Sequence, residues 1–385
     1  MASYFSIDPE LLNGAKLPFE VYINSSAAAK QHFICLFKSG AAISPQMVVE
    51  AKTRFYQLYL KEDDRSAYLS FISKNKSLPV QLRTQILKET AGLYLEPLVG
   101  TDWTKENPEY LARCVMQCRD LVENIIDVVE SKTLEEIKFM LRDLSIHDFY
   151  TFDHSVNVCI YALRFYQQIY TKENRKKVIE MGLGALLHDI GKSKIDTAII
   201  NKPSELSVEE FKEIKEHTRL GREIFFSLMH KLPQDLNWHN IIDIIYQHHE
   251  NVDGSGYPLG LKDKEINNMG KVCMIADIFD ALTSKRSYSD VVSFERALEL
   301  MKKMVGRKLD PDLFNKLLPQ FEEMQTTKAL PKDNLVLHPF FDPSVPYKHM
   351  ELVVDCPVTG YDQTFKHDDY GRVIYVPGTE KKKVS

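Results

Sequence analysis

The pattern of hydrophobic and polar positions changes along the chain, and in the first region it is mixed. Between about residues 18 and 75, the stretches FEVYINS, HFICLFKSG and FYQLYLKEDD are rich in aromatic and β-branched residues, which predicts strands. The stretch ISPQMVVEAKTRF predicts a helix between them, with Ser44 as its N-cap and Pro45 at its first position. We therefore expect a small α/β domain over residues 1–80, with either a regulatory or a purely structural role.

From about residue 80 the apolar positions recur every three or four residues, a spacing typical of amphipathic helices. We expect a helical connector over residues 81–145, which either mediates a homodimer or packs against the next domain. An all-helical domain should follow over residues 146–325. A C-terminal extension over residues 326–385 contains the strand-like stretches MELVVDC and RVIYVPG. The predicted fold class is therefore mostly α.

Composition narrows the class of protein. The chain of 385 residues is 44% hydrophobic and 27% charged, which is ordinary for a soluble globular protein. Its net charge of -5 gives no electrostatic reason to bind nucleic acid or an anionic membrane, and no apolar run reaches the roughly 18 residues of a membrane span. The N-terminus lacks a basic stretch followed by an apolar one, so we expect no signal peptide. The six scattered cysteines indicate reduced thiols in a cytoplasmic protein.

Side chains that can bind metals occur within apolar helical stretches or at their ends. They are His154, His188, Asp189, His217, His248, His249 and Asp277. Burying such groups is costly unless they are partnered. A single histidine of this kind is more often a satisfied core residue than a ligand, but these recur at intervals of about thirty residues, the length of one helical hairpin. A bundle of antiparallel helices would point all of them at one centre.

The types of these side chains constrain the metal. The lack of cysteine among them argues against a closed structural zinc site, whereas imidazoles mixed with carboxylates suit iron, manganese, zinc or nickel. Seven candidate ligands exceed the needs of one ion, so we expect two divalent ions that a carboxylate bridges. Two ions about 3.5–4 Å apart can hold a bridging hydroxide and clamp a phosphoryl group. Phosphodiester hydrolysis is then the predicted reaction class.

Two of the candidates, His248 and His249, are adjacent at the end of the apolar stretch IIDIIYQHH. Neighbouring positions of a helix diverge by about 100°. These imidazoles can therefore share one ion only if the ion sits between them or if the helix unwinds there.

Several separated motifs resemble those of the HD-GYP family of bacterial phosphodiesterases. They are HDIGKSKID, HHENVDGSGYP, IADIFDALTSKRSY and GRKLDPDLF, and they occur in the family's order over roughly residues 146 to 320. The resemblance implies an all-helical HD-type catalytic domain, a non-haem centre of two or three metal ions, and hydrolysis of cyclic di-GMP to pGpG or GMP. Through LFKSG and LYLKEDD, the first region is similar to the small domain that precedes the catalytic unit in one subset of the family.

The resemblance assigns the metal ligands to two sets. Asp189 would bridge both ions. One ion would be bound by His217, His248 and His249, and the other by His188, Asp277 and His154. Iron is the favoured metal and manganese the second choice, and zinc also suits these ligands.

Further residues match the family at positions near the substrate. Lys192 would stabilise the charge that develops when the metal-bridging hydroxide attacks phosphorus, although a solvent-facing lysine is the alternative. Arg286 matches a phosphate-contacting arginine. Tyr257 and Pro258 would form a rigid lip beside the substrate, or a face for a diguanylate cyclase domain. Asp280 would orient a ligand, unless it only caps its helix or lies on the helix surface.

Two positions depart from the family. Members with three metals carry a glutamate where this chain has Tyr150, so we expect two ions and a less certain role for His154. A basic residue that is frequent in the family is replaced by Ser289, which removes one expected phosphate contact.

Two alternatives to a cyclic di-GMP phosphodiesterase stay open. The enzyme would instead hydrolyse another cyclic dinucleotide, such as cyclic GMP-AMP, because the motif residues address metal and phosphate rather than the bases. In the other alternative, the protein is a catalytically weak receptor that binds cyclic di-GMP or a diguanylate cyclase.

Overall fold

The computed structural model describes most of the chain up to residue 323. The described residues are 3–12, 16–25, 32–55, 57–99, 107–130, 132–142, 150–200, 202, 206–284, 293–323, 365–367 and 373–375. The chain divides into two compact units, Met1–Leu95 with Arg113–Leu144, and Glu96–Ala112 with Ser145–Ser385. Helices dominate both, so the predicted mostly α class is confirmed. No described helix has the length and apolar character needed to cross a membrane.

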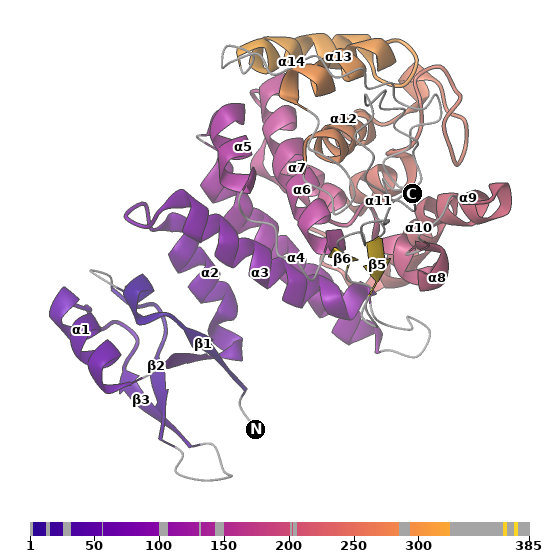
Figure 1. Cartoon of the computed structure of the whole chain (residues 1–385). Helices are drawn as coiled ribbons and strands as arrows, with labels where there is room; N and C mark the ends of the chain where they lie inside the picture. The colour runs from indigo at the N-terminus through magenta and orange to yellow at the C-terminus, as the bar shows by residue number, and fades with distance from the viewer. Residues whose placement is uncertain are drawn as a thin grey trace, which may run out of the picture. The chain divides into compact units, whose positions relative to one another are not determined.

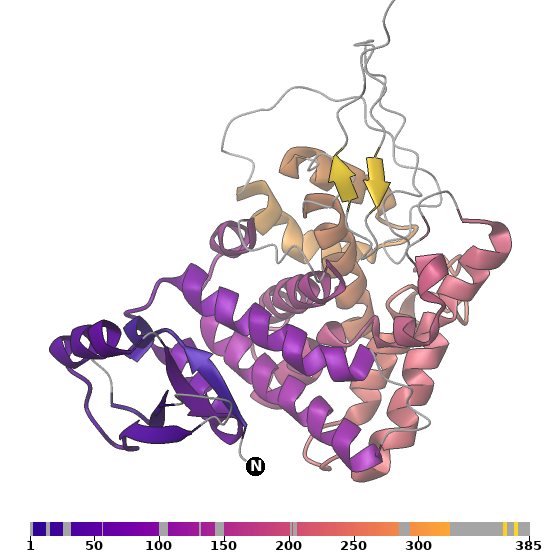
Figure 2. The ribbon, with the colours of Figure 1, turned by 60° about the horizontal axis from the view of Figure 1, so that its bottom comes forward.

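The first unit begins with a small antiparallel sheet, drawn in indigo in Figures 1 and 2. Its strands are β1 (Tyr4–Ile7), β2 (Val21–Asn24), β3 (Phe33–Phe37) and β4 (Leu58–Lys61), in the order β1-β4-β2-β3. Tyr4 pairs with Lys61 at one end of the β1–β4 ladder, and Ile7 pairs with Leu58 at the other. The short helices η1 (Pro9–Leu12) and η2 (Glu62–Asp64) flank it, together with α1 (Pro45–Arg54) and α2 (Arg65–Lys74).

Local sequence explains these elements. In β4, Leu58 and Leu60 are fully buried and alternate with part-exposed neighbours, as a strand with one face on a core requires. The side chain of Ser44 accepts a hydrogen bond from the Met47 N–H, so the predicted N-cap of α1 is confirmed. The first unit also contains much of α3 (Val80–Val99) and α4 (Pro108–Val129), and all of α5 (Leu134–Arg142). Within it, Ser73 of α2 donates a hydrogen bond to Asn124 of α4.

The second unit is built on four helices that lie side by side in Figure 1. They are α6 (Tyr150–Ile169), α7 (Arg175–Leu186), α11 (Trp238–Gln247) and α12 (Asn268–Thr283). Around them are η3 (Ile190–Lys194), α8 (Thr197–Ile200), α9 (Val208–Lys215), α10 (His217–Leu228), η4 (Met229–Lys231), η5 (Asp263–Glu265), α13 (Phe294–Met304) and α14 (Pro311–Glu323). Two further strands, β5 (Phe365–His367) and β6 (Val373–Tyr375), pair antiparallel.

Polar side chains fix where the central helices begin. Asn174, Asn237 and Asn267 each accept a hydrogen bond from a first-turn N–H of α7, α11 and α12 respectively. The buried carboxylate of Glu180 on α7 accepts hydrogen bonds from Asn240 and from the backbone N–H of Asn237, both 2.7 Å long. These bonds lock the start of α11 to α7. The opposite ends of the two helices carry the candidate metal ligands.

Five of the six cysteines lie among the described residues, and Cys356 lies outside them. Cys35, Cys114, Cys118, Cys159 and Cys273 are free thiols, and all but Cys35 are buried.

Candidate metal centre

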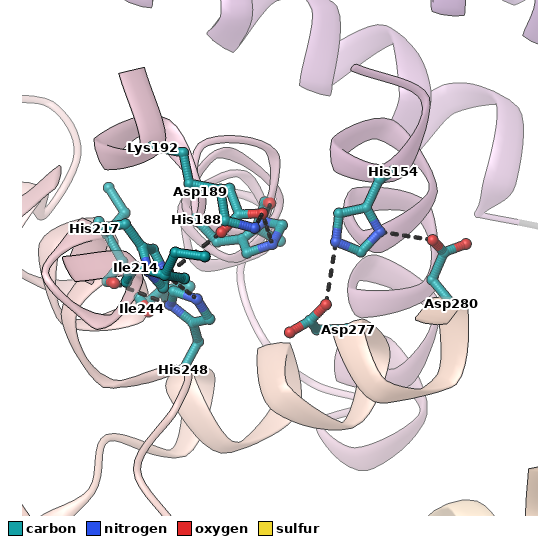
Figure 3. Close-up of polar contacts among 12 residues, drawn as sticks. His154, His188, Asp189, Lys192, Ile214, His217, Ile244, His248, Asp277 and Asp280 are labelled. Atoms are coloured by element: carbon teal, nitrogen blue, oxygen red, sulfur yellow. Dashed lines mark hydrogen bonds and ion pairs between the residues drawn. The ribbon is translucent and has the colours of Figure 1, made fainter. Parts of the chain in front are cut away.

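The structure brings all seven candidate ligands together in two buried clusters. The first contains Asp189, His217, His248 and His249, and the second contains His154, His188 and Asp277. Within each cluster, one donor atom per residue can be chosen so that all lie within 4.8 Å of one another. Figure 3 shows the His248 and Asp277 sides of the centre, with His188 and Asp189 between them. The grouping is the one that the family resemblance implied, while the ligand roles themselves stay a prediction.

The end of α7 supplies one residue to each cluster. The helix ends at Leu186, and His188 and Asp189 occupy the turn before η3. Gly191 in η3 approaches the start of α10 so closely that a Cβ there would lie 1.9 Å from the His217 carbonyl oxygen. Glycine is therefore required at this position, because it lets the turn with Asp189 reach the helix that begins with His217.

The end of α11 resolves the adjacency of His248 and His249. The helix ends at Gln247, so His248 caps it and His249 lies in the turn that follows. Their ring centroids are 4.1 Å apart, with 49° between the planes. Both imidazoles therefore lie beyond the last helical residue, which corresponds to the possibility that the helix unwinds at this point.

The second cluster joins α6 to α12. His154 Nε2 lies 3.2 Å from Asp277 Oδ1, and His154 Nδ1 lies 2.7 Å from Asp280 Oδ2. Ser284 in turn donates a hydrogen bond to Asp280. Asp280 is buried, so it is not a helix-surface residue. It holds the imidazole of His154 in orientation, as an outer carboxylate does for a metal-bound histidine.

Main-chain carbonyls orient three other histidines. The Nδ1 atoms of His188, His217 and His248 lie 2.7, 2.7 and 3.0 Å from the carbonyl oxygens of Ala185, Ile214 and Ile245. A carbonyl oxygen only accepts hydrogen bonds, so each Nδ1 carries the proton. Each Nε2 is then the nitrogen that is left to bind a metal.

Burial keeps the imidazoles of the first cluster neutral. Desolvation lowers the pKa of His217 to about 3 and the pKa of His248 to about 4, and it also holds the pKa of His249 well below its ordinary value. His217 Nε2 and His248 Nε2 face each other at 3.3 Å. Two lone pairs at this separation repel each other, which an intervening cation would relieve.

Nearby charges, rather than burial, determine the direction of the pKa shifts of His154 and Asp189. Burial lowers the pKa of His154, but contacts with Asp277 and Asp280 outweigh it and raise the pKa to about 9. Burial raises the pKa of Asp189, yet the cationic Lys192 and the neighbouring histidines hold the pKa well below its ordinary value. The carboxylate of Asp189 is therefore ionised at neutral pH.

The donor set suits divalent cations. Donors bound to one ion at about 2.0–2.1 Å lie roughly 3.0–3.4 Å apart, which is close to the separation of His217 Nε2 and His248 Nε2. Asp189 Oδ1 and Asp277 Oδ2 are buried and accept no hydrogen bond from any described residue. Buried anionic oxygens without donors are costly, and a bound cation would satisfy both.

The structure describes some of the other residues that were predicted to lie near the substrate. Lys192 lies at the centre, with Nζ 2.7 Å from Asp189 Oδ2, and is not simply solvent-facing. Tyr257 stacks on His249, while Pro258 is exposed. The other two predictions, on Arg286 and Ser289, lie outside the described residues.

Sequence reasoning missed two features of this site. It did not identify the main-chain carbonyls that orient three of the histidines. It also passed over Glu250, a buried acid directly after His249. The only signal for Glu250 was its position between two candidate ligands and a glycine-rich stretch, HHENVDGSG.

The segment that holds this centre is similar in sequence to known proteins. The HD domain family matches residues 145–313, the segment that holds all seven candidate ligands. A cyclic di-GMP phosphodiesterase of Pseudomonas aeruginosa is 30% identical over 193 residues, which are 50% of this chain and 44% of the relative. A 3'3'-cGAMP-specific phosphodiesterase of Vibrio cholerae is 28% identical over 291 residues, which are 74% of this chain and 49% of the relative. The chain thus spans less than half the length of either relative.

One solved structure shares the fold. It is an HDG"Y"P protein from Bdellovibrio bacteriovorus, with a TM-score of 0.50 and 21% sequence identity, and the match covers 84% of this chain and 100% of that one.

Proposed function

We propose that the protein is a metal-dependent phosphodiesterase for a cyclic dinucleotide, on the premise that residues 145–313 match the HD domain family. The observation that carries the proposal is the pair of buried clusters, which meet where Asp189 of the first lies 3.4 Å from His188 of the second. Relatives that act on cyclic di-GMP and on 3'3'-cGAMP supply the substrate class.

Two divalent cations are proposed, one in each cluster, with Asp189 bridging them. Its Oδ1 lies 3.4 Å from His217 Nε2 of the first cluster, and its Oδ2 lies 3.4 Å from His188 Nε2 of the second. Such cations act as Lewis acids on a phosphoryl oxygen and lower the pKa of water. Iron is favoured, followed by manganese and zinc, because these metals accept mixed imidazole and carboxylate ligands.

Lys192 is the proposed contact for a substrate phosphate. Its ammonium lies beside Asp189, and its side chain is 15% exposed, so it lies at the boundary between the buried centre and solvent. A preorganised cation at this place stabilises the negative charge that builds up on the phosphoryl oxygens during hydrolysis. Arg286 is proposed as a second phosphate contact on the strength of its motif alone.

Cyclic di-GMP is the proposed substrate and pGpG or GMP the product, with 3'3'-cGAMP as the alternative substrate. The centre recognises metal and phosphate, so it does not choose between guanine and adenine. The loop with Tyr257 and Pro258, in which Pro258 and Leu259 are exposed, is proposed as a face for a diguanylate cyclase domain on the strength of its motif alone.

The test is hydrolysis by metal-loaded protein. The full chain, loaded anaerobically with Fe²⁺ or with Mn²⁺, should linearise cyclic di-GMP or 3'3'-cGAMP, as followed by chromatography of the nucleotides. A chelator should abolish the reaction, and an Asp189→Ala preparation should be inactive. A metal-loaded protein that binds cyclic di-GMP but converts neither dinucleotide would overturn the enzyme proposal and leave the receptor.

A further inference from the structure

The buried acid Glu250 immediately follows the candidate ligand His249. The residue is 1% exposed, and no charged residue of the described part of the chain is among the groups that act on its carboxylate. Its carboxylate instead accepts backbone N–H groups of Leu259 at 2.6 Å and Leu261 at 2.9 Å. Burying an acid costs free energy, and these hydrogen bonds offset the cost only if the loop keeps this shape.

The loop between Glu250 and Leu261 folds back so that its backbone contacts His249. The Tyr257 N–H donates to the His249 carbonyl at 3.1 Å. Gly256 passes so close to the preceding chain that a Cβ would lie 2.2 Å from the Asn251 nitrogen and 2.5 Å from the His249 oxygen. Only glycine allows this approach. The backbone of the loop is therefore in direct contact with the backbone of His249.

The approach places one aromatic ring against that imidazole. Tyr257 stacks on His249 with ring centroids 4.8 Å apart and 20° between the planes. The ammonium of Lys215 lies 5.0 Å from the centroid of the Tyr257 ring, and the His217 ring is nearly perpendicular to it, with centroids 6.4 Å apart. The Tyr257 ring thus stacks on one residue of the first cluster and lies near a second.

We infer that Glu250 is a positioning residue of the metal centre. It fixes the loop so that Tyr257 packs against the His249 imidazole and holds it in the orientation that a metal ligand needs. The inference rests on the proposed metal centre and gives Tyr257 a supporting role there. Carbonyl oxygens orient His188, His217 and His248, and the stacked ring of Tyr257 restrains the imidazole of His249.

The loop also has anchors that do not depend on Glu250. Near its start, the Asp253 N–H donates to the Arg307 carbonyl at 3.0 Å. Beyond its end, Asp263 pairs with the buried Lys271 at 3.1 Å, and Lys271 pairs with Asp310 at 2.7 Å. Removing the Glu250 carboxylate should therefore release the middle of the loop and leave the domain folded.

Cobalt titration of the full chain tests the inference. Co²⁺ bound by imidazoles and carboxylates absorbs visible light in a manner that reports its geometry, and competition with a chelator gives its affinity. Glu250→Ala should weaken Co²⁺ binding at one site by about 10–100-fold, as is typical when an outer-shell partner is removed. Glu250→Gln should have a smaller effect, because an amide oxygen still accepts one of the two hydrogen bonds.

The matched control is Glu265→Ala. Glu265 also accepts a loop N–H, that of Lys262 at 2.8 Å, but it is exposed and holds Lys262 rather than the segment around Tyr257. This variant should bind Co²⁺ like the unmodified protein. An equal loss of affinity in Glu265→Ala and Glu250→Ala would mean that any loosening of the loop has the same result, and would overturn the inference.

A second pair of variants tests the stacking step and does not require Glu250→Ala to fold. Tyr257→Phe keeps the ring and should keep the Co²⁺ affinity and spectrum, whereas Tyr257→Leu removes the stack and should weaken the same site as Glu250→Ala. Unchanged Co²⁺ binding in Tyr257→Leu would overturn the inference even if the unmodified enzyme hydrolyses its substrate. Normal Co²⁺ binding without hydrolysis in the unmodified protein would instead overturn the proposed function and leave this inference intact.

Discussion

Both clusters of the metal centre combine imidazoles with a carboxylate, but the pKa values of the first cluster's histidines and of His154 in the second are shifted in opposite directions. In the first, burial holds the pKa of His217 at about 3 and the pKa of His248 at about 4, so both imidazoles are neutral. In the second, His154 lies between Asp277 and Asp280, and its pKa rises to about 9 despite burial. The first cluster is therefore ready to bind a cation, whereas the second holds a proton that a cation must displace.

This difference follows from the kind of partner that each histidine has. A carbonyl oxygen orients His217 and His248 without adding a formal charge, while two carboxylates orient His154 and attract a proton as well as a metal. We infer that the first cluster binds its ion over a wide pH range and that the second cluster is the pH-sensitive half.

The largest effect is expected from Asp189→Ala, which removes the carboxylate between the clusters. Each ion should lose a ligand, and the loss of several kcal/mol of charge stabilisation should lower the rate of hydrolysis by on the order of 10³-fold or more. Metal analysis and nucleotide chromatography check this. Asp196→Ala is the control, because Asp196 is exposed and only caps α8. A fully loaded, active Asp189→Ala protein would refute the bridging role.

Removing a single histidine should separate the clusters. His248→Ala should lose the ion of the first cluster, and His154→Ala the ion of the second, so that each variant keeps about half of the bound metal and little activity. Inductively coupled plasma spectrometry of the purified proteins measures the loss. His239→Ala provides the control on α11, where the imidazole is exposed. Loss of both ions in each variant would mean that the clusters bind metal as one unit.

A smaller effect is expected when only the orientation of His154 is disturbed. Asp280→Asn removes the charge behind His154 and should weaken metal binding at the second cluster by about 10–100-fold, with the first cluster unchanged. Competition titration with a chelator resolves the two affinities. Asp312→Asn, an exposed residue of α14, should change neither. If Asp280→Asn weakened the first cluster instead, the assignment of Asp280 to His154 would be wrong.

The pH dependence of metal binding should give the smallest and most specific signal. His154 keeps its proton up to about pH 9 in the metal-free protein, so binding at the second cluster must release that proton. Below that pH, its affinity should rise about tenfold for each unit of pH. The first cluster has only lowered histidine pKa values and should show no such slope between pH 6 and 8 (about the range in which an ordinary histidine titrates). Parallel slopes for both sites would contradict the comparison.

The sequence was most informative where chemistry recurs with the period of the fold. His154, His188, His217, His248 and Asp277 stand about thirty residues apart, and this spacing predicted helices that converge on one place. The adjacency of His248 and His249 also defined a geometric problem, which the end of α11 at Gln247 resolves.

Features that depend on the path of the backbone could not be predicted. The carbonyl partner of each oriented histidine exists only once a helix or turn has formed, and the partners of Glu250 lie nine and eleven residues further along a loop. In the first unit, the strands β2, β3 and β4 fall within predicted stretches, but β1 was missed because its four residues carry too short a pattern. The order β1-β4-β2-β3 results from pairing between distant segments.

The central claim is that the two clusters bind two cations that share Asp189. Anomalous diffraction from crystals of the manganese-loaded protein tests it most directly. The account predicts two peaks, one between His217 and His248 and one between His154 and Asp277, with Asp189 in contact with both. A single peak, or peaks that leave Asp189 without a metal contact, would contradict it.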